Sequence, residues 1–145
     1  MSLYFAYGSN LNHAQMEKRC PGAKFLTAVR LDNYAFVYDS EEGWWRGPVA
    51  NVLPQEGAHV WGALWDLTDE HVASLDKHEN IPVSYQRYDD LVVEDAAGKK
   101  FENVIVYRRT PLVAGRPKEE YQTTILTGAR ECGLPADYIA KLEQA

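Results

Sequence analysis

The N-terminal segment constrains this chain most, because it combines a strand, a tight turn and the start of a helix. Residues 3–7 read Leu-Tyr-Phe-Ala-Tyr, a short apolar run that predicts a buried strand. Gly8 then permits a tight turn that a residue with a Cβ would resist. Ser9 and Asn10 are good N-caps, and they predict a helix over residues 11–19 that a Cys-Pro-Gly sequence stops.

A strand, a glycine turn and a helix start at one place direct several backbone N–H groups toward one point. The first N–H groups of a helix have no partner inside the helix and carry the positive end of its dipole. The turn at Gly8, Ser9 and Asn10 is therefore a candidate site for a carboxylate, a phosphate or a developing oxyanion. The alternative is that these residues only make the turn, since short motifs of this kind are not specific.

Composition limits the classes of protein to which the chain can belong. It has 145 residues, which suits a single domain over residues 1–145, and a net charge of −6 without a run of Lys or Arg. This charge argues against a nucleic-acid partner and against an anionic membrane surface. No apolar run approaches the ~20 residues of a membrane span, and the N-terminus lacks the features of a signal peptide. Since Cys20 and Cys132 are the two cysteines, we expect free thiols and a cytoplasmic location.

The pattern of strands predicts a mixed α+β fold. Two hairpins are indicated, one turning at Asp32-Asn33 and the other at residues 96–99, Ala-Ala-Gly-Lys. About seven strands joined largely by turns predict a small, largely antiparallel β-barrel. The strand over residues 49–53 is expected to end at Pro54. The predicted strands are residues 3–7, 24–31, 34–38, 49–53, 59–67, 87–94 and 101–109.

About four helices are predicted among these strands, beginning with the one over residues 11–19. The second begins at Thr68, a good N-cap that two acidic residues follow in the first turn. The third begins near Pro117 or Lys118 and runs to about Cys132. The fourth begins at Pro135, since proline is favoured at the first helical position.

The second helix places a carboxylate on its apolar stripe. Val72 and Leu75 are three residues apart, and Glu79 continues the same stripe four residues later. Partial burial and the negative end of the helix dipole would both raise the pKa of Glu79 toward neutrality. Such a carboxyl group can accept and donate a proton at neutral pH. The alternative is that the helix frays first and Glu79 is solvated, and Asp76 at the edge of the stripe is a lesser candidate.

Other chemistries lack the residues that they need. His78-Glu79 begins like a zinc-protease motif, but no second His follows at the required spacing, and we expect no metal site. The sequence contains no P-loop, no dinucleotide fingerprint and no Gly-x-Ser-x-Gly elbow. Trp44 and Trp45 either form an aromatic wall over a pocket or anchor a loop on the sheet.

The sequence resembles the gamma-glutamylcyclotransferases over nearly its whole length. Residues 7–11, Tyr-Gly-Ser-Asn-Leu, are similar to the loop that follows the first strand of that family. Residues 60–65, Val-Trp-Gly-Ala-Leu-Trp, are similar to its central strand. Leu75-Asp76 followed by Glu79 resembles the segment that carries the catalytic Glu. Tyr107 resembles an aromatic position on a late strand of the family.

The resemblance implies a mixed α+β fold around a small barrel, and an intramolecular aminolysis that needs no metal, nucleotide or organic cofactor. The free α-amine of a γ-glutamyl group attacks its own side-chain carbonyl and releases 5-oxoproline and a free amino acid or amine. Glu79 is the implied general base and acid. The implied partner is a small-molecule γ-glutamyl substrate, and a homodimer is compatible with the resemblance. The implied substrate-binding residues are Tyr7, Gly8, Ser9, Asn10, Leu11, Tyr107 and Tyr121.

Two other functions stay open at this point. The same cyclisation could act on a γ-glutamylamine or on a γ-glutamyl-protected intermediate, because the loop with Trp44 and Trp45 does not identify the leaving group. A non-catalytic carboxylate-binding module on the same scaffold is the other, although the charge of Glu79 argues against it. The separate roles of Tyr107 and Tyr121, on the substrate or on Glu79, also stay open.

Overall fold

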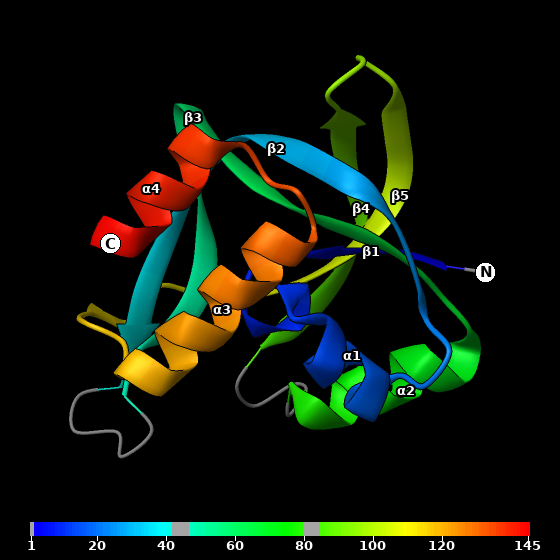
Figure 1. The fold of residues 1–145 in the computed structure, drawn as a ribbon, viewed down its shortest axis with the longest axis horizontal. Helices are drawn as coiled ribbons and strands as arrows, with labels where there is room; N and C mark the ends of the chain where they lie inside the picture. Colours follow the sequence, from blue (N-terminus) through cyan, green and yellow to red (C-terminus); the bar gives the residue numbers. More distant parts are fainter. Residues whose placement is uncertain (1, 42–46, 80–84) are drawn as a thin grey trace.

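The computed structural model describes residues 2–41, 47–79 and 85–145, so Trp44 and Trp45 lie outside the described residues. Within these ranges the chain forms six strands, four α-helices and one short 3-10 helix (Figure 1). In chain order the elements are β1 (Ser2–Ala6), η1 (Ser9–Leu11), α1 (His13–Arg19), β2 (Lys24–Ser40), β3 (Val49–Leu67), α2 (Asp69–His78), β4 (Gln86–Asp95), β5 (Lys100–Arg108), β6 (Val113–Ala114), α3 (Glu119–Glu131) and α4 (Ala136–Gln144).

The strands close into a barrel. The described strands form one sheet in the order β3-β1-β5-β4-β2-β6, and a further pairing of β3 with β2 joins its ends. Five strands make the closed barrel, while β6 is an extra strand on β2. All pairings are antiparallel except that of β1 with β5, where Tyr4 lies opposite Ile105. The predicted α+β class and largely antiparallel barrel are confirmed, with six strands in the described chain instead of about seven.

The first predicted hairpin is wrong, because β2 runs without a break through Asp32-Asn33. Asn33 adopts a positive φ of 65°, and the register with β3 shifts between Asp32 and Tyr34. Asparagine tolerates this left-handed conformation better than most residues. A single such residue inserts a β-bulge, which bends and twists a strand without ending it.

The predicted end of a strand at Pro54 is also wrong, because β3 continues through it to Leu67. Pro54 lies opposite Tyr34, directly beside the bulge, where a missing N–H is tolerated. Gly57 has a φ of 82°, and its N–H donates to the Oδ1 of Asn33 over 3.1 Å. The irregular positions of the two strands therefore meet, and two predicted strand pairs become one long curved pair.

The second predicted hairpin is confirmed. β4 and β5 pair antiparallel, and Gly98 in their connection has a φ of 91°. The carboxylate of Asp95 accepts from the N–H groups of Ala97 and Lys99 at 3.0 and 2.9 Å. This side-chain capping satisfies backbone donors that a tight turn leaves without partners.

The predicted helix over residues 11–19 begins later than expected. Ser9–Leu11 form the short helix η1, and α1 begins at His13 with Asn12 as its N-cap. The Oδ1 of Asn12 accepts from the N–H of Gln15 over 3.0 Å. The prediction that Ser9 or Asn10 caps this helix is therefore wrong, and the side chains of both residues make other contacts.

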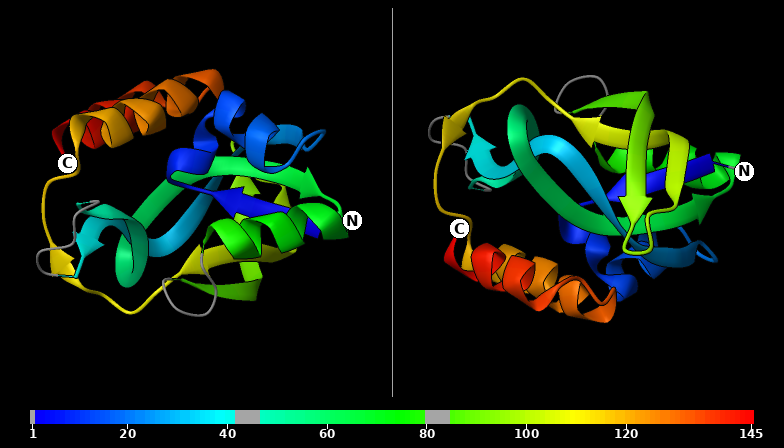
Figure 2. Two further views of the ribbon diagram at one scale, coloured as in Figure 1. Left: turned by 90° about the horizontal axis from the view of Figure 1, so that it is seen from below. Right: turned by 90° about the horizontal axis from the view of Figure 1, so that it is seen from above.

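The remaining helices begin and end close to the predicted residues. Thr68 caps α2, and its hydroxyl and the ring of His71 form a reciprocal capping box. α3 ends at Cys132, followed by Gly133 with a φ of 71°, and Pro135 caps α4. Both views of Figure 2 show α3 and α4 together along one side of the barrel. No α-helix within the described ranges is long and apolar enough to cross a bilayer.

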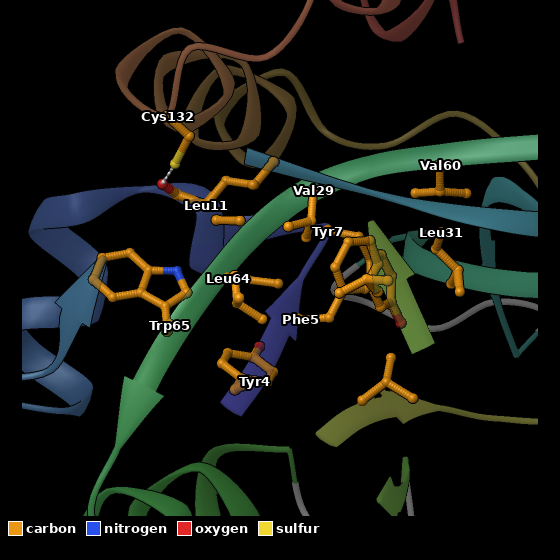
Figure 3. Packing of buried hydrophobic residues seen from close by; sticks show 14 of the residues in the cluster. Tyr4, Phe5, Tyr7, Leu11, Val29, Leu31, Val60, Leu64, Trp65 and Cys132 are labelled. Carbon is orange, nitrogen blue, oxygen red and sulfur yellow. Dashed lines mark hydrogen bonds between the residues drawn. The ribbon is translucent and has the colours of Figure 1, made fainter. Parts of the chain in front are cut away.

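The core lies inside the barrel and beneath the helices. Phe5, Val60 and Leu64 are fully buried. Tyr4 on β1 and Tyr7, which follows β1, are almost fully buried (Figure 3). The thiol of Cys132 donates to the carbonyl of Leu11 over 3.3 Å (Figure 3). This contact fixes α3 onto η1, the short helix that follows β1.

Candidate functional site

The fold brings the N-terminal loop and the end of α2 together. Glu79 is the C-cap of α2, where its N–H donates to the carbonyl of Leu75 over 2.8 Å. Its side chain is half-buried, and its Oε1 lies 3.5 Å from the Nδ2 of Asn10. The helix therefore reaches Glu79 as predicted, and two segments far apart in the sequence meet at this carboxylate.

Asn10 is held in one orientation by its neighbours. It is only 3% exposed, and its Oδ1 accepts from Gln15 Nε2 and from Arg19 Nη1, both over 3.0 Å. Because two donors occupy the carbonyl oxygen, the amide nitrogen must face the other way. There it donates to the hydroxyl of Tyr4 over 2.9 Å and approaches Glu79. Asn10 is thus a fixed neutral donor beside the carboxylate.

Gly8 is required by a close approach and not by an unusual φ. Its φ is −115°, but a Cβ at this position would lie 2.9 Å from the Cβ of Ala50. The N–H groups of Leu11 and Asn12 donate to the carbonyls of Gly8 and Ser9, both over 3.0 Å. Among the turn and loop hydrogen bonds of the described residues, none comes from the N–H groups of Gly8, Ser9 and Asn10, which are the first donors of the short helix.

Ser9 and Leu11 support the loop from its two sides. The Oγ of Ser9 accepts from Gln15 Nε2 over 2.7 Å, which links the loop to α1. Leu11 is fully buried, and a Cβ at Gly128 of α3 would collide with the Leu11 backbone. The loop is therefore pressed between α1 and α3, and its backbone is fixed by packing.

Two tyrosines hold the residue opposite Gly8. The hydroxyl of Tyr121, in α3, accepts from the N–H of Ala50 over 2.9 Å. The hydroxyl of Tyr85 donates to the carbonyl of the same residue over 2.6 Å. Ala50 lies against Gly8, so Tyr85 and Tyr121 enclose the loop from the barrel side. The sequence prediction included Tyr121 and missed Tyr85.

Tyr7 and Tyr107 connect the loop to the carboxylate of Asp76 on α2. The hydroxyl of Tyr7 donates to the carbonyl of Tyr107 over 2.6 Å. The hydroxyl of Tyr107 donates to the Oδ1 of Asp76 over 2.7 Å, and Arg87 donates to the Oδ2 over 2.6 Å. Asp76 is thus paired with a cation, and Tyr107 contacts Asp76.

Glu79 acts electrostatically on four tyrosines, Tyr4, Tyr7, Tyr85 and Tyr121, which we call the tyrosine cluster. Burial raises the pKa of each hydroxyl, and the charge of Glu79 raises it further. The pKa of Tyr121 is raised to about 12. The four hydroxyls therefore stay protonated near neutral pH.

A buried ion pair lies against Tyr85, a member of the tyrosine cluster. Arg109 Nη2 pairs with Asp39, and both residues are almost fully buried. Asn51 joins them, because its Nδ2 donates to Asp39 Oδ2 over 3.2 Å and its Oδ1 accepts from the Arg109 N–H over 3.2 Å. The guanidinium lies 4.5 Å from the ring centre of Tyr85. Sequence reasoning missed this group, because polar residues on strands ordinarily face solvent.

The cysteines are not activated for chemistry. Both are free and buried. Burial raises the pKa of Cys20 to about 11 and that of Cys132 to about 12. Each thiol is therefore protonated and unreactive near neutral pH. Within the described ranges, no three His, Cys, Asp or Glu side chains gather in a group that could hold a metal ion.

Comparison with known proteins identifies a consistent set of relatives. Residues 59–142 match the AIG2-like family. The gamma-glutamylcyclotransferase of Bos taurus is 32% identical over 144 residues, which cover 97% of this chain and 76% of that protein. The gamma-glutamylcyclotransferase of Homo sapiens is 31% identical, over 97% of this chain and 77% of that protein. A solved gamma-glutamyl cyclotransferase structure superposes with a TM-score of 0.91 at 31% identity, covering 98% of this chain and 86% of the other.

Proposed function

This chain belongs to the AIG2-like family as a gamma-glutamylcyclotransferase relative, and from this premise we propose that it converts γ-glutamyl amino acids to 5-oxoproline and a free amino acid. The observation that carries the proposal is the meeting of Glu79 with Asn10 across 3.5 Å. It combines a carboxylate for the substrate ammonium with a loop of backbone donors for its carboxylate or oxyanion.

The reaction joins two parts of one substrate. The α-nitrogen attacks the γ-carbonyl carbon, a C–N bond forms, and the carbonyl oxygen becomes an oxyanion. The C–N bond to the leaving group then breaks. Since the nucleophile is already tethered, proximity supplies ~7–11 kcal/mol of the barrier in well-oriented cases. The protein has to move protons and stabilise charge.

Glu79 is the proposed group for both proton transfers. As a carboxylate it binds the α-ammonium and removes its proton, which makes the nitrogen nucleophilic. After the attack, the carboxylic acid gives this proton to the leaving nitrogen. The carboxylate then accepts a second proton from the new ring nitrogen and passes it to the released amine, so that two protons move from the α-nitrogen to the leaving nitrogen in one turnover. Glu79 is half-buried at the C-terminal end of α2, and both features favour its protonated form. This is the form that the first proton transfer produces.

The groups around Glu79 are proposed to stabilise the negative charge of the substrate and the conformation of the N-terminal loop. The N–H groups of Gly8, Ser9 and Asn10 are the proposed donors to the substrate carboxylate or to the oxyanion. Tyr7, Leu11 and Tyr121 hold this loop in place through the contacts described above. Tyr107 is proposed to position Glu79 indirectly. Its hydroxyl holds Asp76, which lies about one helical turn before Glu79.

We also propose a domain organisation, a cellular location and an oligomeric state. Residues 1–145 act as one catalytic domain in the cytoplasm, where the two buried free thiols remain reduced. A homodimer is proposed on the family resemblance, and light scattering after size exclusion measures it directly. A monomeric mass that holds across the working concentration range contradicts the dimer and leaves the reaction unaffected.

The test is release of 5-oxoproline, measured by mass spectrometry, from a panel of γ-glutamyl dipeptides and γ-glutamyl amines. The matched control is the same dipeptide acetylated on its α-nitrogen, which cannot attack. Release from the free dipeptide and none from the acetylated one supports cyclotransfer. Glutamate instead of 5-oxoproline means hydrolysis, and calorimetric binding of 5-oxoproline without turnover of any substrate means a binding module.

A further inference from the structure

Arg109 is a buried cation for which the proposed reaction has no role. The residue is 9% exposed, and its partner Asp39 is 2% exposed. Arg109 Nη2 donates to the Asp39 carbonyl over 2.8 Å and pairs with its carboxylate. Its Nε is buried and has no hydrogen-bond partner within the described residues. A buried N–H without a partner is costly, so this donor can gain from an acceptor that reaches it.

Asp39 does not use up the donors of Arg109. The Oδ2 of Asp39 is occupied by the amide of Asn51 at 3.2 Å and by the N–H of Leu112 at 3.1 Å. A guanidinium carries five N–H donors in a planar fork, and only those of Nη2 bond to Asp39. Burial opposes the charge of Arg109, but Tyr85 and Asp39 raise its pKa, so the cation persists.

The position of Arg109 relates it to the proposed site. Its guanidinium lies 4.5 Å from the ring centre of Tyr85, whose hydroxyl bonds to the Ala50 carbonyl over 2.6 Å. Ala50 in turn lies against Gly8 of the loop. Arg109 is therefore linked to the loop through two residues, Tyr85 and Ala50.

Arg109 and Glu79 lie beside different members of the tyrosine cluster, because Arg109 contacts Tyr85, whereas Asn10 bonds to Tyr4 and approaches Glu79. The charge of Arg109 lowers the pKa of Tyr85 and Tyr121, while that of Glu79 raises both. At Tyr4, beside Asn10, the acting charges are those of Glu79 and Arg19. A substrate bound along the cluster would meet Glu79 at one end and Arg109 at the other.

We propose that Arg109 binds the carboxylate of the leaving amino acid and so makes the site selective for γ-glutamyl amino acids over γ-glutamyl amines. This inference rests on the proposed function. The α-ammonium and α-carboxylate share one carbon, so both bind at the end where Asn10 and Glu79 meet. The remaining charge on the substrate is the carboxylate of the leaving group. The buried guanidinium bonds to Asp39 and Tyr85 and keeps its Nε–H without a partner among the described residues, so it is suited to bind this carboxylate.

The experiment compares two substrates that differ in this carboxylate alone, γ-glutamyl-alanine and γ-glutamyl-ethylamide. The parent protein is expected to turn over the first with a kcat/KM about 10-fold or more above that of the second. In Arg109→Gln, KM for γ-glutamyl-alanine rises about 10-fold or more, and the constants for the ethylamide stay within about twofold. Arg108→Gln is the matched control, because Arg108 also has a buried Nε without a partner among the described residues, but its guanidinium lies 4.1 Å from the ring centre of Tyr88, outside the tyrosine cluster. It is expected to change neither substrate.

A second variant tests the same idea in the opposite direction. Asp39→Asn keeps the cation and removes its counter-charge, so KM for γ-glutamyl-alanine should fall while that for the ethylamide holds. Equal changes for both substrates in both variants, or a parent without preference, overturn the role of Arg109 and leave cyclotransfer standing. A parent that turns over neither compound nor any other γ-glutamyl substrate overturns the proposed function and this inference with it.

Discussion

Carboxylates at the two ends of the tyrosine cluster have opposite surroundings. Glu79 is half-buried beside the neutral amide of Asn10 and the neutral hydroxyls of the cluster. Asp39 is fully buried against the guanidinium of Arg109. The Asp39 carboxylate is bound by a buried cation, whereas the Glu79 carboxylate lies beside an amide that donates to it and is partly open to solvent. The same side-chain chemistry therefore lies in a buried ion pair at one end, and at the other end it is the group for which we propose proton transfer.

The largest expected effect comes from breaking the Asp39 end. Removal of one partner from a buried ion pair leaves the other charge uncompensated, and costs about 3–5 kcal/mol. Asp39→Ala should lower the free energy of unfolding by this amount in a urea titration. The control is Asp32→Ala in the exposed pair of Arg30 and Asp32, separated by 2.7 Å, where about 1 kcal/mol or less is expected. Equal losses in both variants would contradict the assignment of Asp39.

The Glu79 end should respond in the other way, with activity lost and stability kept. Glu79→Gln removes the proton-transfer group while keeping its shape, and turnover should fall by about 10²-fold or more. The free energy of unfolding should change little, because the site is half-buried. Asp76→Asn, on the same helix, is the control and should reduce turnover far less. Normal turnover by Glu79→Gln, measured as 5-oxoproline release, would exclude it as the base.

Gly8 tests how closely the two ends are coupled, since it lies between the loop and Ala50. A Cβ here meets the Ala50 Cβ at 2.9 Å, and overpacking typically costs about 1–3 kcal/mol. Gly8→Val should lose more stability and more affinity for substrate than Gly8→Ala. Urea unfolding and KM measure the two losses. Full stability and activity in Gly8→Val would show that the loop can move away from Ala50 without consequence.

The smallest expected effect is that of a single hydroxyl in the middle of the cluster. Tyr121→Phe removes the acceptor for the N–H of Ala50 and should cost about 0.5–1.5 kcal/mol. Tyr88→Phe is the control, because its exposed hydroxyl bonds only to Gln86 among the described residues. Thermal unfolding measures both variants. A larger loss in Tyr88→Phe than in Tyr121→Phe would contradict the proposed support of Ala50.

Local patterns predicted the features that local chemistry determines. Thr68 and the apolar spacing of α2 were enough to predict that Glu79 ends this helix on its buried side. The hairpin at residues 96–99 followed from its small residues and glycine. In contrast, Asn33 and Pro54 are turn signals by sequence, but barrel closure keeps both strands paired through them. Tertiary pairing overrides such signals, and a bulge absorbs the conflict.

The Arg109 end could not be found from the sequence because its parts come from separate strands. Asp39 ends β2, Asn51 lies near the start of β3, and Arg109 follows β5. Each polar residue alone is typical of a solvated strand end. Only the closed sheet buries all three together, so burial, the signal that singles them out, is a property of the fold.

The bond from the hydroxyl of Tyr7 to the carbonyl of Tyr107 joins residues 100 positions apart. Contacts of this range are slow to form, because a long stretch of chain must be ordered before they contribute. A chain that has left the ribosome only as far as α2 already contains the loop and Glu79, but it lacks β5, the parallel neighbour of β1. We therefore expect activity to appear late in refolding, after the helices have gained their far-ultraviolet signal, in a single phase with closure of the barrel.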